Sequence, residues 1–170
     1  MRLHHVLIAA AVALGGCAGV ESVADRFDLE DEDIAALSAG NPVAVQNGHA
    51  YHAMYDIKGT QFDQYEYTET VMATLSRALA KRGVPVAPDA KKSVTLKVRM
   101  AGYGLRMITV FHMQFHSAVM LEVALGNGEK WVQHAKDWSP GGYGRSFDAS
   151  ALRALSYAVR DPRFVAYLKE

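Results

Sequence analysis

The chain has 170 residues, of which 50% are hydrophobic and 21% are charged, with 18 basic residues against 18 acidic ones. The length fits one domain, and the balanced charge argues against a nucleic-acid-binding protein, which needs clustered positive charge. A single cysteine excludes an intramolecular disulfide and a zinc site built on cysteines. The composition is that of a globular chain, which excludes a collagen, a fully disordered tail and a polytopic membrane protein.

The first seventeen residues have the pattern of a secretion signal. Arg2 supplies a positive charge, and an unbroken apolar run follows over residues 6–14. A helix that spans a bilayer needs about 20 residues, so this run has the length of a signal-peptide core instead. The sequence Leu14-Gly15-Gly16-Cys17 comes next and resembles the bacterial lipobox, in which small residues precede an invariant cysteine.

The lipobox resemblance implies that residues 1–16 are removed and that Cys17, acylated on its thiol and on its new amino group, becomes the first residue. Two or more acyl signals hold a protein firmly on a bilayer, whereas one binds marginally. Ala18, in place of an aspartate, resembles the sorting pattern of outer-membrane lipoproteins that face the periplasm. The alternative is an ordinary secretory signal with an incidental cysteine.

Residues 17–46 are predicted to form the lipidated cysteine and an acidic tether. Seven acidic residues lie between Glu21 and Asp33, while the chain beyond Asp33 carries 16 basic against 11 acidic residues, a net charge of +5. The segment is expected to be a solvated spacer between membrane and domain. The alternative is that it docks on a basic face of its own domain or of a partner. Residues 47–170 are then a single periplasmic domain.

Alternating and helical patterns define the first half of that domain. Residues 50–57 alternate as a strand, and Asp63 with Glu66 has the spacing of a capping box at the start of a helix that runs to Arg82. Gly83 suits the position just after the helix. Residues 93–100 form the clearest strand, with one apolar and one polar face.

The second half continues with strands and two helices. Residues 102–104 are predicted to turn, and residues 106–125 keep one apolar phase, as one long bent strand or as two strands joined by a bulge. Gly126-Asn127-Gly128 predicts a hairpin to a strand over 130–138. Asp148 is predicted to cap a helix over 148–160, with Phe147 stapled onto Leu152, and Pro162 opens a final helix.

This β-α-β-β-β-α-α order predicts an α+β fold, with a mainly antiparallel sheet of about four strands and the helices packed on one face. Over residues 48–168 the order resembles that of small periplasmic assembly and export lipoproteins, such as PelC and the N-terminal domain of TolB. The resemblance concerns layout alone, so no functional residue is carried over.

The residues offer no convincing catalytic, metal or cofactor site. His49 and His52 point to opposite faces if they lie on a strand, and His112 and His116 are about 13 Å apart along one. A metal site would need histidines from neighbouring strands, for instance His116 with His134. Asp63, Glu66 and Glu69 cluster near a helix start, where the helix dipole accounts for them. We therefore expect no catalytic residue, no metal ion and no cofactor.

The segment 105–115 carries apolar residues in both strand phases. One phase, with Met107, Phe111 and Met113, is expected to enter the core. Ile108 and Val110 then face outward and need a cover, either a partner surface or the N-terminal segment through Ile34 and Leu37. We therefore hypothesise an interaction interface in this segment, formed by Leu105, Ile108, Val110, Phe111 and Met113.

These features favour a non-enzymatic lipoprotein, anchored to the outer membrane through Cys17 and facing the periplasm, that serves as an interaction or assembly component of an envelope or export system. Its expected partners are the membrane and either an envelope protein or further copies of itself, but no nucleic acid. The alternative function is a carrier that holds a lipid or small apolar molecule between the sheet and the helices.

Overall fold

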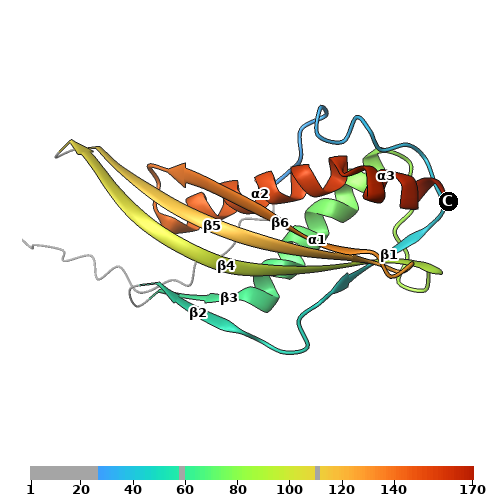
Figure 1. Ribbon diagram of the computed structural model, residues 1–170, viewed down its shortest axis with the longest axis horizontal. Coiled ribbons are helices and arrows are strands. Elements are labelled where there is room, and N and C mark those ends of the chain that lie inside the picture. Colours follow the sequence, from blue (N-terminus) through green and yellow to red (C-terminus); the bar gives the residue numbers. More distant parts are fainter. Residues whose placement is uncertain (1–26, 58–59, 110–111) are drawn as a thin grey trace, which may run out of the picture.

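The structure is a computed structural model that describes residues 27–57, 60–109 and 112–170 (Figure 1). The chain contains both strands and helices, in segregated runs, and the predicted α+β class is confirmed. In chain order the elements are β1 (Val43–Asn47), β2 (Met54–Ile57), β3 (Thr60–Asp63), α1 (Gln64–Lys81), β4 (Lys92–Thr109), β5 (His112–Leu125), β6 (Lys130–Ser139), α2 (Tyr143–Arg160) and α3 (Pro162–Lys169).

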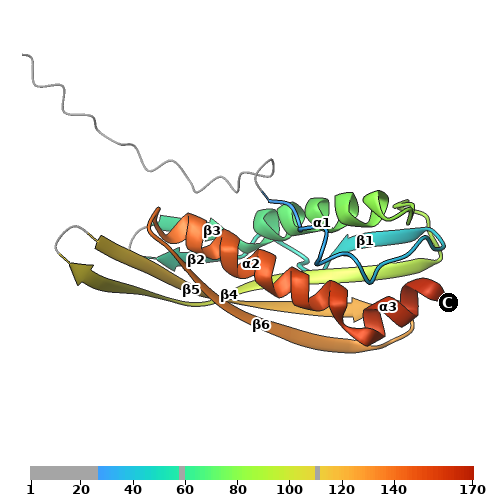
Figure 2. The same cartoon turned by 90° about the horizontal axis from the view of Figure 1, so that it is seen from above.

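The main sheet has four strands in the order β1-β4-β5-β6. Strand β1 runs parallel to β4, and the other two pairings are antiparallel. Strands β2 and β3 form a separate antiparallel hairpin. Figure 2 shows α1 and α2 along one side of the main sheet. The predicted arrangement, a mainly antiparallel sheet with helices on one face, is thereby confirmed.

The core lies between this sheet and the two long helices. On β4, Val94, Leu96 and Val98 are fully buried, and each pairs with a buried apolar residue of β5. The facing helices contribute buried aliphatic side chains such as Leu75 and Leu155. The polar residues between the buried ones point to the other face of the sheet, because successive side chains of a strand alternate.

The N-terminal segment belongs to the core, which corrects the predicted tether. Phe27, Leu29, Ile34 and Leu37 are buried, and β1 continues the segment into the sheet. Such apolar side chains gain about 1.5–3 kcal/mol each on burial, which holds the segment against the domain. A solvated spacer is therefore wrong for residues 27–46, whereas residues 17–26 lie outside the described residues.

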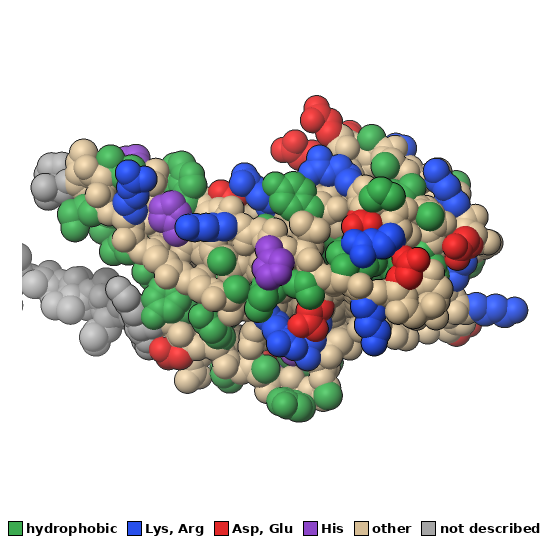
Figure 3. Space-filling view, viewed as in Figure 1, with side chains coloured by type: hydrophobic (Ala, Val, Ile, Leu, Met, Phe, Trp, Pro, Cys, Tyr) green, Lys and Arg blue, Asp and Glu red, His purple; other side chains and the backbone are tan. Residues whose placement is uncertain are grey.

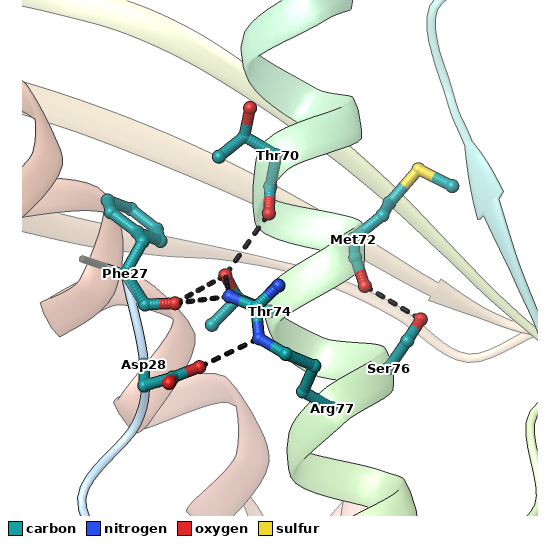
Figure 4. A network of polar contacts seen from close by, with 7 residues as sticks. All are labelled: Phe27, Asp28, Thr70, Met72, Thr74, Ser76 and Arg77. Carbon is teal, nitrogen blue, oxygen red and sulfur yellow. Dashed lines mark hydrogen bonds and ion pairs between the residues drawn. The ribbon is translucent and has the colours of Figure 1, made fainter. Parts of the chain in front are cut away.

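Polar contacts fix the same segment on α1, as Figure 4 shows. The backbone oxygen of Phe27 accepts hydrogen bonds from the Thr74 hydroxyl at 2.7 Å and from the Arg77 guanidinium at 2.8 Å. The acidic side chains also pair with basic residues of the helices: Asp28 with Arg77, Asp31 with Lys81, and Asp33 with Arg160. The alternative interpretation, that this segment docks on a basic face of its own domain, describes residues 27–37 correctly.

Several element boundaries differ from their predictions. The expected first strand over 50–57 is reduced to β2, and β1 lies earlier, at residues assigned to the tether. The expected turn at 102–104 is part of β4. The long apolar run divides into β4 and β5, which pair with each other as far as Thr109 and His112. Its second half pairs with β6, as predicted.

Helix α1 begins and ends as predicted, but α2 does not. The Asp63 carboxylate caps α1 by accepting from the Tyr65 N–H at 2.9 Å, and Gly83 adopts a left-handed φ of 75° after its end. Helix α2 begins at Tyr143, five residues before the predicted cap, after Gly142 with a φ of 102°. Glycine permits that backbone conformation, which other residues rarely adopt.

Asp148 lies inside α2 and bonds to the core instead of capping the helix. It accepts a hydrogen bond from the Tyr67 hydroxyl at 2.9 Å. Burial raises the pKa of the Asp148 carboxyl, although this hydrogen bond and the nearby Arg145 act in the opposite direction. Phe147 is fully buried and packs edge-on against Phe62, with ring centroids 5.0 Å apart.

Candidate functional site: an apolar strand arm and a histidine–carboxylate cluster

Strands β4 and β5 continue past the start of α2 as an extension, seen at the left of Figures 1 and 2. Within this extension, strand β6 pairs only with the base, at residues 115–118 of β5. We define the arm as residues 102–109 and 112–118. A register shift stands at its base, because Met100 pairs with Val119 while Gly102 pairs with Ala118. One extra residue in β4 reverses which side its odd and even positions face. Odd positions of both strands therefore share one side from Tyr103 to Met107 on β4 and from Met113 to Ser117 on β5, and a second register shift between Met107 and Thr109 ends this pattern.

That side, the inner face of the arm, continues the core-facing side of the sheet. It pairs Tyr103 with Ser117, Leu105 with Phe115, and Met107 with Met113. Only its base is covered, where the Tyr143 ring of α2 meets Tyr103 and Phe115 edge-on, with centroids 5.4 and 5.0 Å apart. The inner face thus begins as an aromatic cluster and ends as bare aliphatic and thioether side chains.

The exposure of the predicted interface residues differs from expectation. Met107 and Met113 are predicted to enter the core, but they are 67% and 44% exposed. Helix α2 begins at Tyr143, over the base of the arm, and does not extend over these two residues. Leu105 and Ile108 are 45% and 50% exposed. Val110 and Phe111 lie outside the described residues, as does the predicted lipidation site, Cys17. Ile34 and Leu37 do not cover the arm. They are buried beside the helices, where Arg82 donates to the Leu37 backbone oxygen and Arg160 pairs with Asp33.

The outer face of the arm is polar and basic. Arg106 pairs with Gln114, and a shallow groove is lined by Gly102, Gly104, His116 and Lys136. No aspartate or glutamate occurs between Arg99 and Glu122 in the sequence. Figure 3 shows hydrophobic, basic and histidine side chains on the visible face of the arm. The arm therefore offers a large apolar side and a positive side, which is a pairing typical of interaction surfaces.

A second candidate site joins the loop before β2 to the start of α1. The Nδ1 atom of His52 contacts the Oδ2 atom of Asp63. One atom from each of His52, Asp63 and Glu66 lies within 4.8 Å of the others. The His52 ring also stacks at a tilt on Tyr65, with centroids 4.8 Å apart. We call these three residues the His52 cluster.

Electrostatics favour an ion pair within the His52 cluster. The hydrogen bond and the charge of Asp63 raise the pKa of His52, against a small effect of burial. Burial acts to raise the pKa of Asp63, but hydrogen bonds from His52 and from the Tyr65 N–H outweigh it, so this pKa lies below its usual value. The sequence indicates the positions of the two carboxylates, because the helix dipole favours acidic residues at a helix start. It does not indicate that His52 lies beside them, because that contact depends on how the loop folds.

The other histidine pairs considered in the sequence do not converge. His49 turns away from His52, and its Nε2 atom lies 2.9 Å from the backbone oxygen of Val98. His116 stands opposite Trp138, whereas His134 stands opposite Met120, four positions along β5. At the usual rise of a strand, those two positions are about 13 Å apart.

Within the described ranges, no helix combines the length and the apolar character that crossing a membrane requires. Comparison with known proteins finds no matching family model and no matching curated sequence. Two solved structures show a distant likeness. A DUF330 family protein from Xanthomonas campestris shares 11% identity and a TM-score of 0.42, covering 73% of this chain and 83% of its own.

The second structure is a protein from Caulobacter crescentus whose name places it provisionally among the lipoproteins. It shares 16% identity and a TM-score of 0.38, covering 81% of this chain and 93% of its own. At such levels of identity and structural similarity, neither likeness assigns a family or an activity to this chain.

Proposed function

We propose that this protein is a non-enzymatic lipoprotein, anchored through Cys17 to the periplasmic face of the outer membrane, which binds an envelope protein through the inner face of its arm. The observation that carries the interaction role is the exposure of Leu105, Met107 and Met113 on a strand pair that projects beyond the helices. The membrane anchor is supported by the lipobox resemblance of Leu14-Gly15-Gly16-Cys17.

The chemistry of the inner face suits an adaptable protein contact. Methionine side chains are flexible and polarisable, so they fit partner surfaces of varied shape. The aromatic cluster of Tyr103, Phe115 and Tyr143 holds the base of the arm on α2, so that the apolar end is presented in a fixed direction. Long exposed strand pairs with apolar faces are an aggregation hazard, and a partner that covers this face removes it.

Substituting Met107 and Met113 together with lysine is expected to abolish partner binding without unfolding the domain. The two residues face each other across the strands, so the pair places two charges at the centre of the proposed contact. Because both side chains are exposed, the free energy of unfolding is expected to change by about 0.5 kcal/mol per site or less. The measurement is cross-linking in intact envelopes, followed by affinity purification and identification of the proteins recovered.

The matched control is Gln114→Lys with His116→Lys, which adds two positive charges to the outer face of the arm, where these residues pair with Arg106 and Gly104. A partner that is captured by the wild type and by this control, but lost in the methionine variant, supports the proposal. Equal capture by all three forms contradicts it. Lipid that co-purifies with the wild type and is lost from the methionine variant, without any protein partner, would favour the carrier function instead.

Replacing Cys17 with serine is expected to prevent lipidation and to release the protein from the membrane. Serine offers no thiol for acylation, so the chain should collect as an unprocessed precursor or in the soluble fraction, with nearly complete loss from outer membranes. Fractionation with mass spectrometry of the N-terminal peptide measures both effects, and Ala18→Ser is the control that keeps the thiol. Unchanged fractionation and maturation of the Cys17 variant would show that the anchor assignment is wrong.

A further inference from the structure

The His52 cluster has the donor set of a metal site, and it joins the loop before β2 to the start of α1. His52 lies in the loop before β2, Asp63 ends β3, and Glu66 lies in the first turn of α1. An imidazole nitrogen with two carboxylate oxygens is a ligand set that Zn²⁺ accepts. We propose that His52, Asp63 and Glu66 bind one divalent transition-metal ion, with Zn²⁺ as the probe.

The spacing of the donor atoms is close to what one ion requires. Ligands at about 2.1 Å from a tetrahedral Zn²⁺ stand about 3.5 Å from one another. The three donor atoms lie within 4.8 Å of one another, so a modest closure of exposed side chains is enough. The contacting atoms of His52 and Asp63 must move apart slightly so that the ion can bind between them.

Each of the two carboxylates has an oxygen atom that is available to bind the ion. Asp63 uses Oδ1 to accept from the Tyr65 N–H at 2.9 Å, which leaves Oδ2 for the ion. Glu66 is exposed, and among the described residues no hydrogen bond or ion pair engages its carboxylate. The ion pair joins His52 to Asp63, and the helix dipole favours both carboxylates at this end of α1. A bound cation would in addition bring the Glu66 carboxylate into one site with the other two donors.

The loop that carries His52 is fixed on both sides of that residue. Before it, the Asn47 side chain donates to the Tyr65 backbone oxygen at 3.1 Å and to the Glu69 carboxylate at 2.7 Å. After it, the Gln64 N–H donates to the Ala53 oxygen at 2.8 Å. These contacts, together with the Tyr65 ring beneath the imidazole, hold His52 beside the helix start before any ion arrives. Ordering the ligands in advance lowers the entropic cost of binding.

A site of this kind leaves at least one coordination position for water or for a ligand from another molecule, because only three protein atoms are supplied. Binding would join the loop before β2 to the start of α1. The site uses no residue of the inner face of the arm. Metal binding and the proposed partner contact can therefore be tested independently.

The test is a Zn²⁺ titration of the full-length Cys17→Ser chain, in which no thiol competes for the metal. Calorimetry against a competing chelator gives stoichiometry and affinity, and thermal unfolding gives the effect on stability. We expect one equivalent of Zn²⁺ to bind and to raise Tm. Replacement of the residues around a metal ligand typically costs about 10–100-fold in affinity, so His52→Gln and Glu66→Gln should each weaken binding at least tenfold.

The matched control is His134→Gln, which removes another exposed histidine on β6 and should leave the affinity unchanged. Circular dichroism of each variant without metal checks that the fold is retained. The proposal is overturned if no Zn²⁺ binds, or if His52→Gln keeps the wild-type affinity. It is also overturned if His134→Gln weakens binding as much as His52→Gln does, since that indicates unspecific binding to surface histidines.

Discussion

Replacing Leu96 with aspartate is expected to unfold the domain. Leu96 is fully buried in the first half of β4, between Asn47 of β1 and Val123 of β5, on the side of the sheet that the helices cover. A carboxylate at this position loses its hydration and gains no partner among the aliphatic side chains that surround it. The cost is expected to be about 5 kcal/mol or more, which is comparable with the whole stability of an ordinary domain. Circular dichroism and urea unfolding of the purified protein measure the effect.

Thr95→Asp is the control, because it adds the same charge to the neighbouring position of the same strand. Thr95 is half-buried on the outer face, where its hydroxyl lies 3.4 Å from the Gln46 side chain. Aspartate is a poor strand residue, so a loss of about 1 kcal/mol is expected from this variant. If Leu96→Asp unfolds at the same urea concentration as the control, the assignment of the buried face is wrong.

Truncating Phe27 to alanine is expected to destabilise the whole domain, even though the residue lies before the first strand. The ring is 2% exposed and meets Tyr67 edge-on, with centroids 6.4 Å apart. Removing a buried phenylalanine side chain typically costs about 3–5 kcal/mol, from lost burial and from the cavity that remains. Urea unfolding, followed by tryptophan fluorescence, should therefore show a much lower midpoint with a single transition.

Glu30→Ala is the control within the same segment, since Glu30 is exposed and its backbone contacts do not depend on the side chain. Its free energy of unfolding should stay within about 0.5 kcal/mol of the wild type. Equal stability of the two variants would mean that residues 27–37 detach from the domain in solution and serve as a spacer after all.

Local patterns in the sequence determined the elements whose signals lie within a few residues. The alternation over 94–100 gave one buried face, since side chains of a strand point to opposite sides. The cap at Asp63 and the glycine at 83 placed both ends of α1, and Gly128 placed a turn, because caps and tight turns depend on neighbouring backbone groups. The lipobox resemblance at Cys17 is equally local, and its consequence stays a prediction.

Tertiary structure decided the features that depend on distant partners. Residues 27–47 are polar enough to resemble a spacer, and only the surface of α1 and the edge of β4 give Phe27 and β1 their places. The exposure of Met107 follows from where α2 begins, about 35 residues later in the chain. The His52 cluster needs a loop folded back onto a helix start. No local pattern encodes these distances, because each is set by packing between elements that are remote in the sequence.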